Sequence, residues 1–326
     1  MTSTIRQPLI LFYNPFFRHW PDTGGIEGCR FTTDRAALAQ ADAVIFHLPS
    51  CAEIWAAPKY PGQLWVAASM ESAASCPDLA DPAFMRAFDL TMTFQRGSDA
   101  WSPYFSLARA DELSAPASVK SASAPAVLFL SAPQDRCGRL AYLSELMAHL
   151  PVDSYGKVLH NRDLDTPDQG RRSKFDTVQR YKFYLAFENS IEPDYVTEKF
   201  FQALVAGAVP VYRGAPNIRD FWPGAECCID AADFAGPAEL AAHLQALDQD
   251  DAAYWRYQAW RAQGVSESFR RVFAPTARPA LARLCDQILT RTDPVPGPRG
   301  APTRPLAWRQ WLRRAADGRH APVLPG

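Results

Sequence analysis

The sequence predicts an α/β protein that is built on parallel β-sheets and divided into two domains. Short apolar runs typical of buried strands alternate with amphipathic segments typical of helices along most of the chain. Residues 181–214 follow the strand–helix–strand order of a β-α-β unit, in which a right-handed crossover joins parallel strands. The chain has 326 residues, of which 48% are hydrophobic, and this is enough for two ordinary domains with separate cores.

Composition excludes several classes of function. The formal net charge is −1 and no nucleic-acid-binding motif occurs, so no global field attracts nucleic acid. The seven cysteines are odd in number and lack C-x-x-C spacing, which argues against a zinc site and against a disulfide framework. We expect reduced core thiols and a cytoplasmic protein, because the sequence shows neither a secretory leader pattern nor an apolar run of roughly 20 residues.

The first domain is predicted over residues 1–113. An aromatic loop, residues 14–20, follows its first strand, and we favour packing of these rings beneath the loop over contact with a ligand. A helix is expected over residues 33–40. The predicted strands are residues 8–13, 43–47, 63–68 and 90–94.

Glu71 lies just past the carboxyl end of the third predicted strand. In parallel sheets, ligands gather beyond this end of the strands, so a carboxylate there can face a cleft. It can act as a general base if it reaches an acceptor hydroxyl. A surface or helix-capping glutamate is the alternative that the pattern leaves open.

A change in composition marks the predicted domain boundary. Residues 114–125 contain small residues, proline, one valine and one lysine, which is typical of a linker. The second domain is predicted over residues 126–293, beginning with a strand at 126–130 and a helix at 139–150. Arg139 opens that helix directly after a strand and a polar loop, where a cation can meet phosphate. A surface arginine is the alternative.

The β-α-β unit carries the clearest signal in the chain. Its first strand, residues 181–187, places Phe183, Leu185 and Phe187 on one face and is expected to be buried on both sides. Asp194 stands where a helix N-cap belongs, and Gly207 ends the helix as its C′ residue. A second strand follows at residues 208–212.

Polar side chains gather where the first of these strands ends and the helix begins. A carboxylate beside a lysine suits a sugar nucleotide, since the acid accepts hydrogen bonds from hydroxyls and the ammonium offsets phosphate charge. A solvated first helical turn would give the same pattern. The residues at this edge are Glu188, Asn189, Tyr195, Glu198 and Lys199.

The last part of the chain is expected to be helical. Helices are predicted over residues 240–247, 252–261 and 278–289, and the final ones could pack back on the first domain. Residues 294–326 form a Pro/Arg-rich tail in which residues 306–316 have an amphipathic pattern. An interfacial helix that contacts the membrane, a helix packed on the body and a disordered tail all remain open.

The β-α-β segment closely resembles the signature block of the α-1,3-fucosyltransferases, glycosyltransferase family 10. That block runs much like F-x-L-A-F-E-N-S, D-Y-V-T-E-K and A-G-x-V-P-V-x-x-G, and residues 183–214 hold nearly all of it. The resemblance extends over about residues 8–290. Met70, Glu71 and Ser72 are similar to a family region in which proline usually occupies the position of Ala73. Further similar segments are residues 29–35, 41–47, 88–99 and 130–156.

The resemblance implies the GT-B architecture, in which two Rossmann-like domains face a cleft and the C-terminal one holds GDP-fucose. Carried over by position, Arg139 and Lys199 would hold the diphosphate, and Glu198 would take the ribose hydroxyls. Asn189 and Tyr195 would line the phosphate and sugar region. Glu71 would be the catalytic base.

The resemblance also implies an inverting transfer of L-fucose to a hydroxyl, O3 being favoured, of an N-acetylglucosamine or glucose unit. The acceptor would be an oligosaccharide, of the Lewis-antigen kind, or a lipopolysaccharide precursor. No Asp-x-Asp motif for a catalytic metal occurs, so no cofactor is expected, although stimulation by Mg²⁺ or Mn²⁺ stays open. We expect a cytoplasmic enzyme that could touch the inner membrane through its basic C-terminal helix. The alternatives are a GT-B transferase that uses another sugar nucleotide, and a non-catalytic nucleotide-sugar-binding module.

Overall fold

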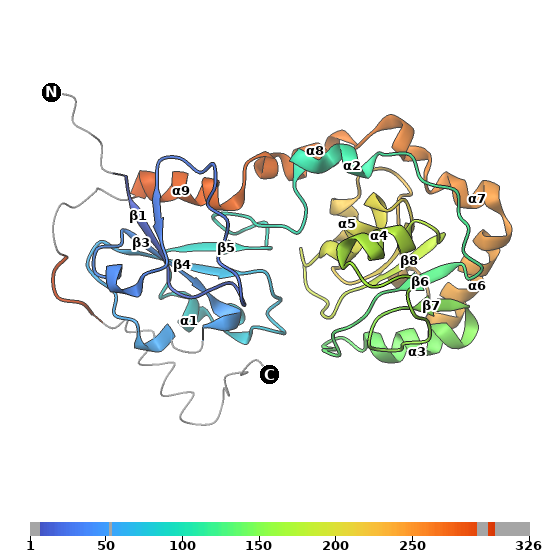
Figure 1. Cartoon of the computed structure of the whole chain (residues 1–326), viewed down its shortest axis with the longest axis horizontal. Helices are drawn as coiled ribbons and strands as arrows, with labels where there is room; N and C mark the ends of the chain where they lie inside the picture. The colour runs from blue at the N-terminus through green and yellow to red at the C-terminus, as the bar shows by residue number, and fades with distance from the viewer. Residues whose placement is uncertain (1–6, 52–53, 292–298, 304–326) are drawn as a thin grey trace. The chain divides into compact units, whose positions relative to one another are not determined.

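The computed structural model describes residues 7–51, 54–291 and 299–303, and the chain falls into two compact units (Figure 1). The first unit holds the residues up to Pro103 together with those from Arg278 onward. The second unit holds the residues from Tyr104 to Ala277. Each contains one five-stranded parallel sheet, so the predicted α/β class with two Rossmann-like units is confirmed.

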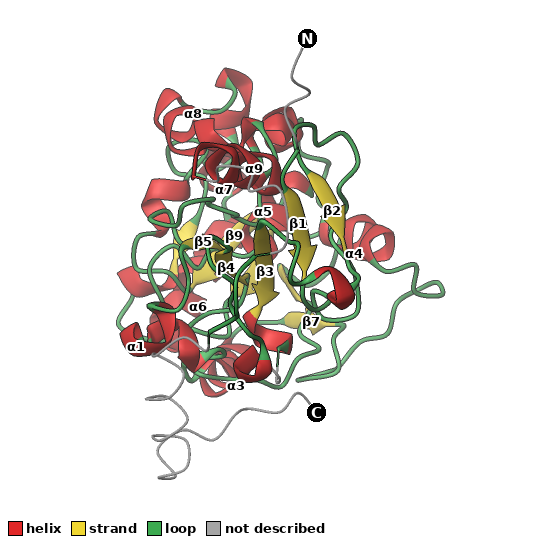
Figure 2. Ribbon diagram, turned by 90° about the vertical axis from the view of Figure 1, so that its left-hand side faces the viewer, coloured by secondary structure: helices red, strands yellow, loops and turns green. Residues whose placement is uncertain are grey.

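The sheet of the first unit has the strand order β2-β1-β3-β4-β5. Its central strands are apolar and buried on both faces, as expected for a parallel sheet. Figure 2 shows β2, β1 and β3 side by side. The strands are β1 (Leu9–Phe12), β2 (Arg30–Thr32), β3 (Ala43–His47), β4 (Leu64–Ser69) and β5 (Leu90–Thr93).

Two hydrophobic cores cover the two faces of this sheet. One contains Phe46, Trp65 and Phe84, the last of which lies on the short helix α1 (Pro82–Met85). The other is closed by α9 (Ala280–Arg291), whose Leu284 and other buried residues pack on Ile10, Phe12 and their neighbours. Figure 1 shows α9 lying along the strands of this unit although it is far away in sequence.

The sheet of the second unit has the strand order β10-β9-β8-β6-β7. Alternation along its strands sends Phe183, Leu185 and Phe187 to one face, as the sequence predicted. The strands are β6 (Ala126–Leu128), β7 (Val152–Ser154), β8 (Phe183–Phe187), β9 (Val209–Arg213) and β10 (Ile229–Asp230).

Helices pack on both faces of this second sheet. Helices α3 (Arg139–His149), α6 (Pro237–Gln249) and α7 (Asp251–Arg256) close the core that contains Phe183. On the other face, Phe200 of α5 (Glu198–Val205) packs against Tyr212 of β9. The remaining helices of this unit are α2 (Ala110–Leu113), α4 (Arg171–Val178) and α8 (Glu267–Phe273). An aromatic cluster joins α5 to α8 and consists of Phe105, Phe201, Phe269 and Phe273.

The structure divides the chain at Pro103, earlier than the predicted linker. Residues 114–125 lie along the second unit, where Lys120 donates to the carbonyl oxygens of Gln179 and Gly207 at 3.0 and 2.7 Å. The buried guanidinium of Arg261 donates to the carbonyl oxygens of Leu113 and Ala115. Small residues and prolines allow this extended segment to pack closely on the second unit. A flexible linker has the same composition, so the sequence alone does not distinguish the two.

The end of the described chain returns to the first unit. Besides α9, residues 299–303 lie there, and the Arg299 guanidinium forms a buried ion pair with Asp42 at 2.6 Å. The domain prediction placed residues up to 293 in the second domain and allowed the final helices to pack back. The predicted amphipathic helix at 306–316 lies outside the described residues.

Other local predictions differ from the structure. The expected helix at 33–40 is a single 3₁₀ turn, Arg35–Ala37, and β2 was not predicted because its three residues carry no apolar run. The prediction that the aromatic side chains of residues 14–20 pack beneath the loop is wrong for Phe17 and Trp20, which are 53% and 46% exposed. Phe16, in contrast, stacks on the buried ring of His47 with ring centroids 4.5 Å apart.

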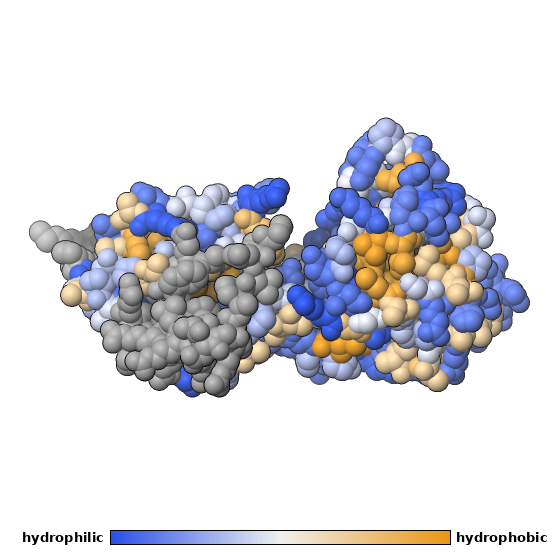
Figure 3. All heavy atoms as spheres, turned by 90° about the horizontal axis from the view of Figure 1, so that it is seen from below, coloured by the Kyte–Doolittle hydropathy of each residue, from blue (hydrophilic) through white to orange (hydrophobic). Residues whose placement is uncertain are grey.

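The described surface is largely polar on the face seen in Figure 3. There the second unit is mainly hydrophilic, and its hydrophobic side chains gather in a few patches. Within the described part of the chain, no helix is both long and apolar enough to cross a membrane.

Leu284 provides a test of how α9 packs. It is fully buried, so Leu284→Ala should lower the free energy of unfolding of the first unit by about 2–5 kcal/mol through lost packing. Leu289 on the same helix is 41% exposed, and Leu289→Ala should change it by less than about 0.5 kcal/mol. Urea unfolding monitored by tryptophan fluorescence measures both, and equal effects would contradict the packing of α9.

Candidate functional site

The site predicted from the β-α-β unit is organised by a buried carboxylate at the end of β8. Glu188 follows Phe187 and has no exposed surface. Its Oε1 accepts the backbone N–H of Thr197 and its Oε2 accepts the Thr197 hydroxyl, both at 2.8 Å. The Lys199 ammonium lies 3.4 Å from Oε2. Glu188 therefore fixes the first turn of α5 to the carboxyl end of the central strand, where its charge also complements the helix dipole.

Thr197 is the N-cap of α5, and the prediction of Asp194 in that role is wrong. The Thr197 hydroxyl accepts the backbone N–H of Lys199, while Asp194 has a left-handed backbone with φ of 66° and bonds to Asn217. The loop needs three more residues to turn before the helix begins. Gly207 has φ of 75° and ends α5 as predicted.

Gly214 explains why β9 ends as it does. A Cβ atom at this position would lie 2.4 Å from the Tyr212 hydroxyl and 2.6 Å from Glu188 Cγ. Any side chain would therefore displace the buried carboxylate or the tyrosine. The Tyr212 hydroxyl donates to the Tyr195 carbonyl oxygen at 3.1 Å and accepts the Ala215 N–H at 2.9 Å. The end of β9 thus helps to hold the loop that precedes α5.

Lys199 lies between two carboxylates. Its ammonium is 3.3 Å from Glu198 Oε1 as well as 3.4 Å from Glu188. Burial lowers the pKa of Lys199, but the carboxylates of Glu188 and Glu198 outweigh it and raise the pKa above its ordinary value. The lysine is therefore a permanent cation in a cluster that also holds two acids.

Glu198 is the more accessible member of the cluster, with 42% of its side chain exposed. Burial opposes its ionisation, but Lys199 and then Lys174 overcome that effect and lower its pKa. A cavity of about 120 Å³ opens beside it, and its walls include the cationic side chains of Arg109 and Arg171. An ionised acceptor thus borders a space that also contains Arg171 and Arg109, and the Arg109 guanidinium is paired with Glu112.

Arg139 occupies the predicted position at the start of α3 but is closed to solvent, with 1% of its surface exposed. Its guanidinium donates to the carbonyl oxygens of Phe187, Ala132 and Gln134 at 3.2, 3.0 and 2.7 Å. Its Nε is buried and has no partner among the described residues. In this structure Arg139 holds the loop before α3 against the end of β8, and it does not display its charge to a ligand.

Asn189 and Tyr195 also lie at this edge. The Asn189 Oδ1 atom is buried and lacks a hydrogen-bond partner within the described ranges, whereas its carbonyl oxygen accepts the N–H of Arg136 at 2.9 Å. Tyr195 is 3% exposed, and its ring meets that of Tyr104 edge-on. The structure therefore brings together Arg139, Asn189, Tyr195, Glu198 and Lys199, all in the second unit.

Glu71 belongs to the first unit and lies two residues past the end of β4. It is half-buried, and its backbone N–H donates to the Ser69 hydroxyl at 3.0 Å while its carbonyl oxygen accepts that hydroxyl at 3.1 Å. This turn fixes the backbone of Glu71 at the carboxyl edge of the sheet, where the sequence placed it.

Two side chains of the site had no role in the sequence prediction. Glu188 was placed at the edge but not assigned, because no pattern shows that a strand-end acid will be buried under a helix. Lys174 comes from α4, and its distance in sequence from α5 hides the contact. Among residues 7–51, 54–291 and 299–303, no group of three histidine, cysteine or acidic side chains is arranged to hold a metal ion.

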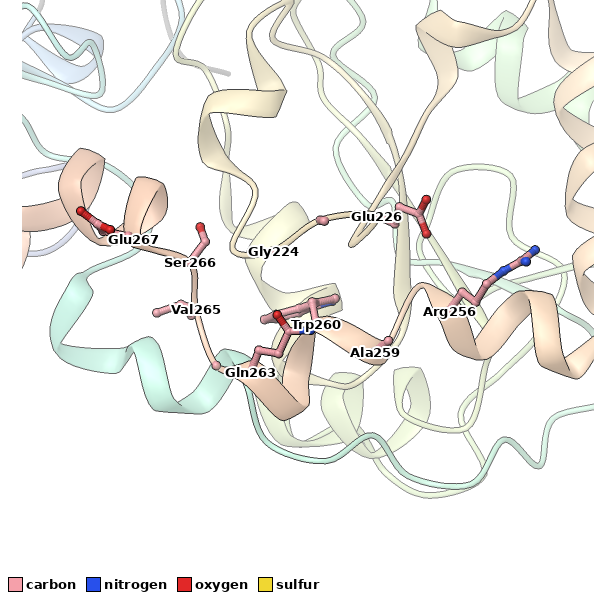
Figure 4. Close-up of a pocket in the computed structure, with 11 residues that line it drawn as sticks. Gly224, Glu226, Arg256, Ala259, Trp260, Gln263, Val265, Ser266 and Glu267 are labelled. Carbon is pink, nitrogen blue, oxygen red and sulfur yellow. The ribbon is translucent and has the colours of Figure 1, made fainter.

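A larger cavity lies elsewhere in the second unit. It has a volume of about 520 Å³ and is lined by residues before β10 and by residues from the end of α7 to the start of α8. Figure 4 shows Trp260 in its middle, with Glu226 and Arg256 on one side and Val265 and Ser266 on the other. None of the predicted donor-binding residues lines this cavity. The volume of a cavity therefore does not identify the predicted donor site in this protein.

Comparison with known families settles the relationship. Residues 119–294 match the family model described as glycosyltransferase family 10 (fucosyltransferase) C-term, and residues 5–105 match the model described as fucosyltransferase, N-terminal. The chain belongs to glycosyltransferase family 10. The family predicted from the signature block is thereby confirmed.

Curated relatives of this family member share more than a third of the aligned residues. A fucosyltransferase-like protein of Arabidopsis thaliana is 40% identical over 234 residues, which cover 71% of this chain and 44% of the relative. The 4-galactosyl-N-acetylglucosaminide 3-alpha-L-fucosyltransferase FUT6 of Homo sapiens is 38% identical over 248 residues, or 73% of this chain and 66% of that protein. The family 10 chain thus spans about half to two thirds of the length of these relatives.

Solved structures support the fold. A crystal structure of an alpha1,3-fucosyltransferase has a TM-score of 0.61 at 17% identity, covering 90% of this chain and 95% of that one. A second, with GDP-fucose, has a TM-score of 0.54 at 17% identity and covers 84% and 91%. Together with the two parallel sheets, these matches confirm the GT-B class for this family 10 protein.

The role of Glu188 can be tested through stability. Glu188→Ala leaves the Thr197 N–H and the buried side of the Lys199 ammonium without their anion, so it should lower the free energy of unfolding by about 3–5 kcal/mol. Glu145 is an exposed acid on α3 of the same unit, and Glu145→Ala should change it by less than about 0.5 kcal/mol. Chemical denaturation measures both, and a small effect of Glu188→Ala would rule out the anchoring role.

Proposed function

We propose that this protein is an inverting fucosyltransferase that moves L-fucose from GDP-fucose to a hydroxyl of a saccharide. The observation that carries the proposal is the Glu198–Lys199 pair, anchored by Glu188 at the carboxyl edge of a parallel sheet in a family 10 chain. This is the edge at which α/β sheets bind nucleotides. One solved structure of similar fold was determined with GDP-fucose, which supports this donor.

In the proposed donor complex, the ionised Glu198 accepts hydrogen bonds from the ribose hydroxyls. Lys199 offsets the charge of the diphosphate and stabilises it as the leaving group. An added interaction that forms in the transition state contributes about 2.7–4 kcal/mol when its donor is fixed in advance. Glu188 provides that fixation, because it holds the Lys199 ammonium in place before any ligand binds.

Arg139 enters this proposal in a changed role. Direct contact with the diphosphate stays a prediction that its closed position here does not favour. Its three bonds to backbone carbonyl oxygens instead hold the loop before α3 beside Asn189. Asn189 and Tyr195 remain proposed to line the phosphate and sugar region.

Glu71 is the proposed catalytic base. A direct displacement at the anomeric carbon inverts its configuration and requires one base on the acceptor hydroxyl. The acceptor proposed is an N-acetylglucosamine or glucose unit of an oligosaccharide or a lipopolysaccharide precursor, with transfer to O3. Relatives named as 3-alpha-L- and as 4-alpha-L-fucosyltransferases of galactosyl-N-acetylglucosaminides support the sugar. We further propose that no metal is required, since the charge of the leaving group is met by Lys199.

The proposed function is tested by incubating the protein with GDP-fucose and lactose, N-acetyllactosamine or its type-1 isomer. Mass spectrometry should show addition of one fucose to lactose and to N-acetyllactosamine, and NMR of these products should show an α-linkage to O3, whereas the type-1 isomer, whose O3 already carries galactose, should give no product. Parallel reactions with GDP-mannose and UDP-sugars should give no transfer. Transfer from another donor would favour a different sugar-nucleotide transferase, and GDP binding without any product would favour a binding module.

Lys199→Ala and Glu71→Ala should separate donor binding from chemistry. Loss of a charge-assisted contact of about 1.5–3 kcal/mol should raise the Kd for GDP about 10–100-fold in Lys199→Ala. Glu71→Ala should leave the Kd for GDP within about twofold and abolish turnover, because the base does not contact the donor. Isothermal titration calorimetry and product assays measure the two effects. A loss of GDP affinity in Glu71→Ala as large as in Lys199→Ala would refute its assignment as the base.

A further inference from the structure

Lys174 is an unusual lysine because its ammonium lies between helices and aromatic rings. It comes from α4 and lies over the rings of Tyr184 and Phe129, 5.2 and 5.9 Å from their centroids. It donates a hydrogen bond to Gln202 Oε1 at 2.7 Å. No carboxylate of the described residues forms an ion pair with it. Lys174 is half-buried, and ammonium groups largely withdrawn from water are normally paired with an anion, so this arrangement calls for an explanation.

Gln202 connects this lysine to the donor site. It lies one turn after Glu198 on α5, so both side chains project from the same face of the helix. Both also line the cavity of about 120 Å³ that opens beside Glu198. Through Gln202, Lys174 thus contacts the face of α5 that carries Glu198, and it does so from the side that packs on the protein core.

The balance of charge around the donor site explains why a lysine lies at this position. Glu188 and Glu198 carry two negative charges around the single ammonium of Lys199. A second cation nearby offsets that excess before an anionic ligand arrives. Lys174 also contributes to the lowered pKa of Glu198, after Lys199.

We propose that Lys174 is a positioning residue of the donor site, which holds Gln202 and, from beneath the shared face of α5, keeps the Glu198 carboxylate oriented for the ribose hydroxyls of the nucleotide. This inference rests on the proposed function, because it assumes that Glu198 meets a ribose. Lys174 itself does not contact the sugar nucleotide in this scheme. Its effect is therefore expected on the part of the affinity that depends on the ribose hydroxyls.

The ammonium of Lys174 titrates in an accessible range. Burial lowers its pKa to about 8, with Lys199 acting in the same direction and the carboxylates of Glu198 and Glu188 opposing. Lys174 also lies over the ring of Tyr184, a titratable residue whose hydroxyl has its pKa raised by burial. Since Lys174 is charged below its pKa, its attraction for the Glu198 carboxylate is present near pH 7 and is lost as the pH rises through 8 to 9, whereas Glu198, whose pKa is lowered, stays ionised over this range.

The test compares the Kd values of GDP and 2′-deoxy-GDP by calorimetry for the wild type, Lys174→Met and Lys174→Arg. The wild type should prefer GDP about tenfold, the effect of one hydrogen bond to a charged acceptor. Lys174→Met should bind GDP about tenfold more weakly and lose that preference, with little change for 2′-deoxy-GDP. Lys174→Arg keeps the charge and should restore both values to within about twofold.

The pH profile gives a readout that a purely structural role does not move. Between pH 7 and 9 the GDP affinity of the wild type should fall relative to that of Lys174→Arg, whose charge persists. Lys182→Met is the matched control, because Lys182 is also a half-buried lysine above a tyrosine ring in the same unit, but it is paired with Asp248 and Asp251. This variant should keep the wild-type affinity ratio and pH profile.

The outcomes separate the two proposals. Failure of the wild type to bind GDP would overturn the proposed function and this inference with it. GDP binding by the wild type with an unchanged affinity ratio in folded Lys174→Met would overturn the inference alone. An equal loss for GDP and 2′-deoxy-GDP would also overturn it, since Lys174 would then not act through the ribose. Thermal unfolding confirms that each variant is folded.

Discussion

The buried carboxylate of Glu188 holds together the part of this protein on which its proposed chemistry depends. It lies at the end of β8 with no exposed surface and bonds at once to the N-cap Thr197 and to Lys199. Burying such a charge is unfavourable unless every lone pair has a donor. The surrounding structure supplies two hydrogen bonds from Thr197 and the ammonium of Lys199, and Gly214 leaves the space the side chain needs. Strand, helix and loop are therefore fixed relative to one another by one group.

This anchoring prepares the site electrostatically before a ligand binds. Two carboxylates raise the pKa of Lys199, and two lysines lower the pKa of Glu198, so both groups are charged near neutral pH. A fixed arrangement of this kind stabilises a leaving diphosphate without the reorganisation that water would need. The unpaired Oδ1 of Asn189 and the unpaired Nε of Arg139 are further polar atoms at the same edge that the described residues leave unsatisfied.

Much of the fold could be predicted from the sequence because parallel strands buried on both faces leave a strong local signal. The alternation of Phe183, Leu185 and Phe187 and the left-handed Gly207 are examples, and both agree with the structure. Glu198 and Lys199 could be proposed because they begin a helix that follows such a strand. The N-cap was placed wrongly at Asp194, since a short polar side chain at a turn and one at a cap have the same local chemistry.

The sequence by itself determined the α/β class, the family and the strand edge at which the predicted donor residues gather. Only the tertiary structure decided that Arg139 is sealed behind backbone carbonyls, that Lys174 lies under α5 and that α9 closes the first unit. The physical reason is the range of the interactions. Periodicity and the glycine that ends a helix are local signals along the chain, whereas burial, pairing and charge balance depend on residues that meet only when the chain is folded.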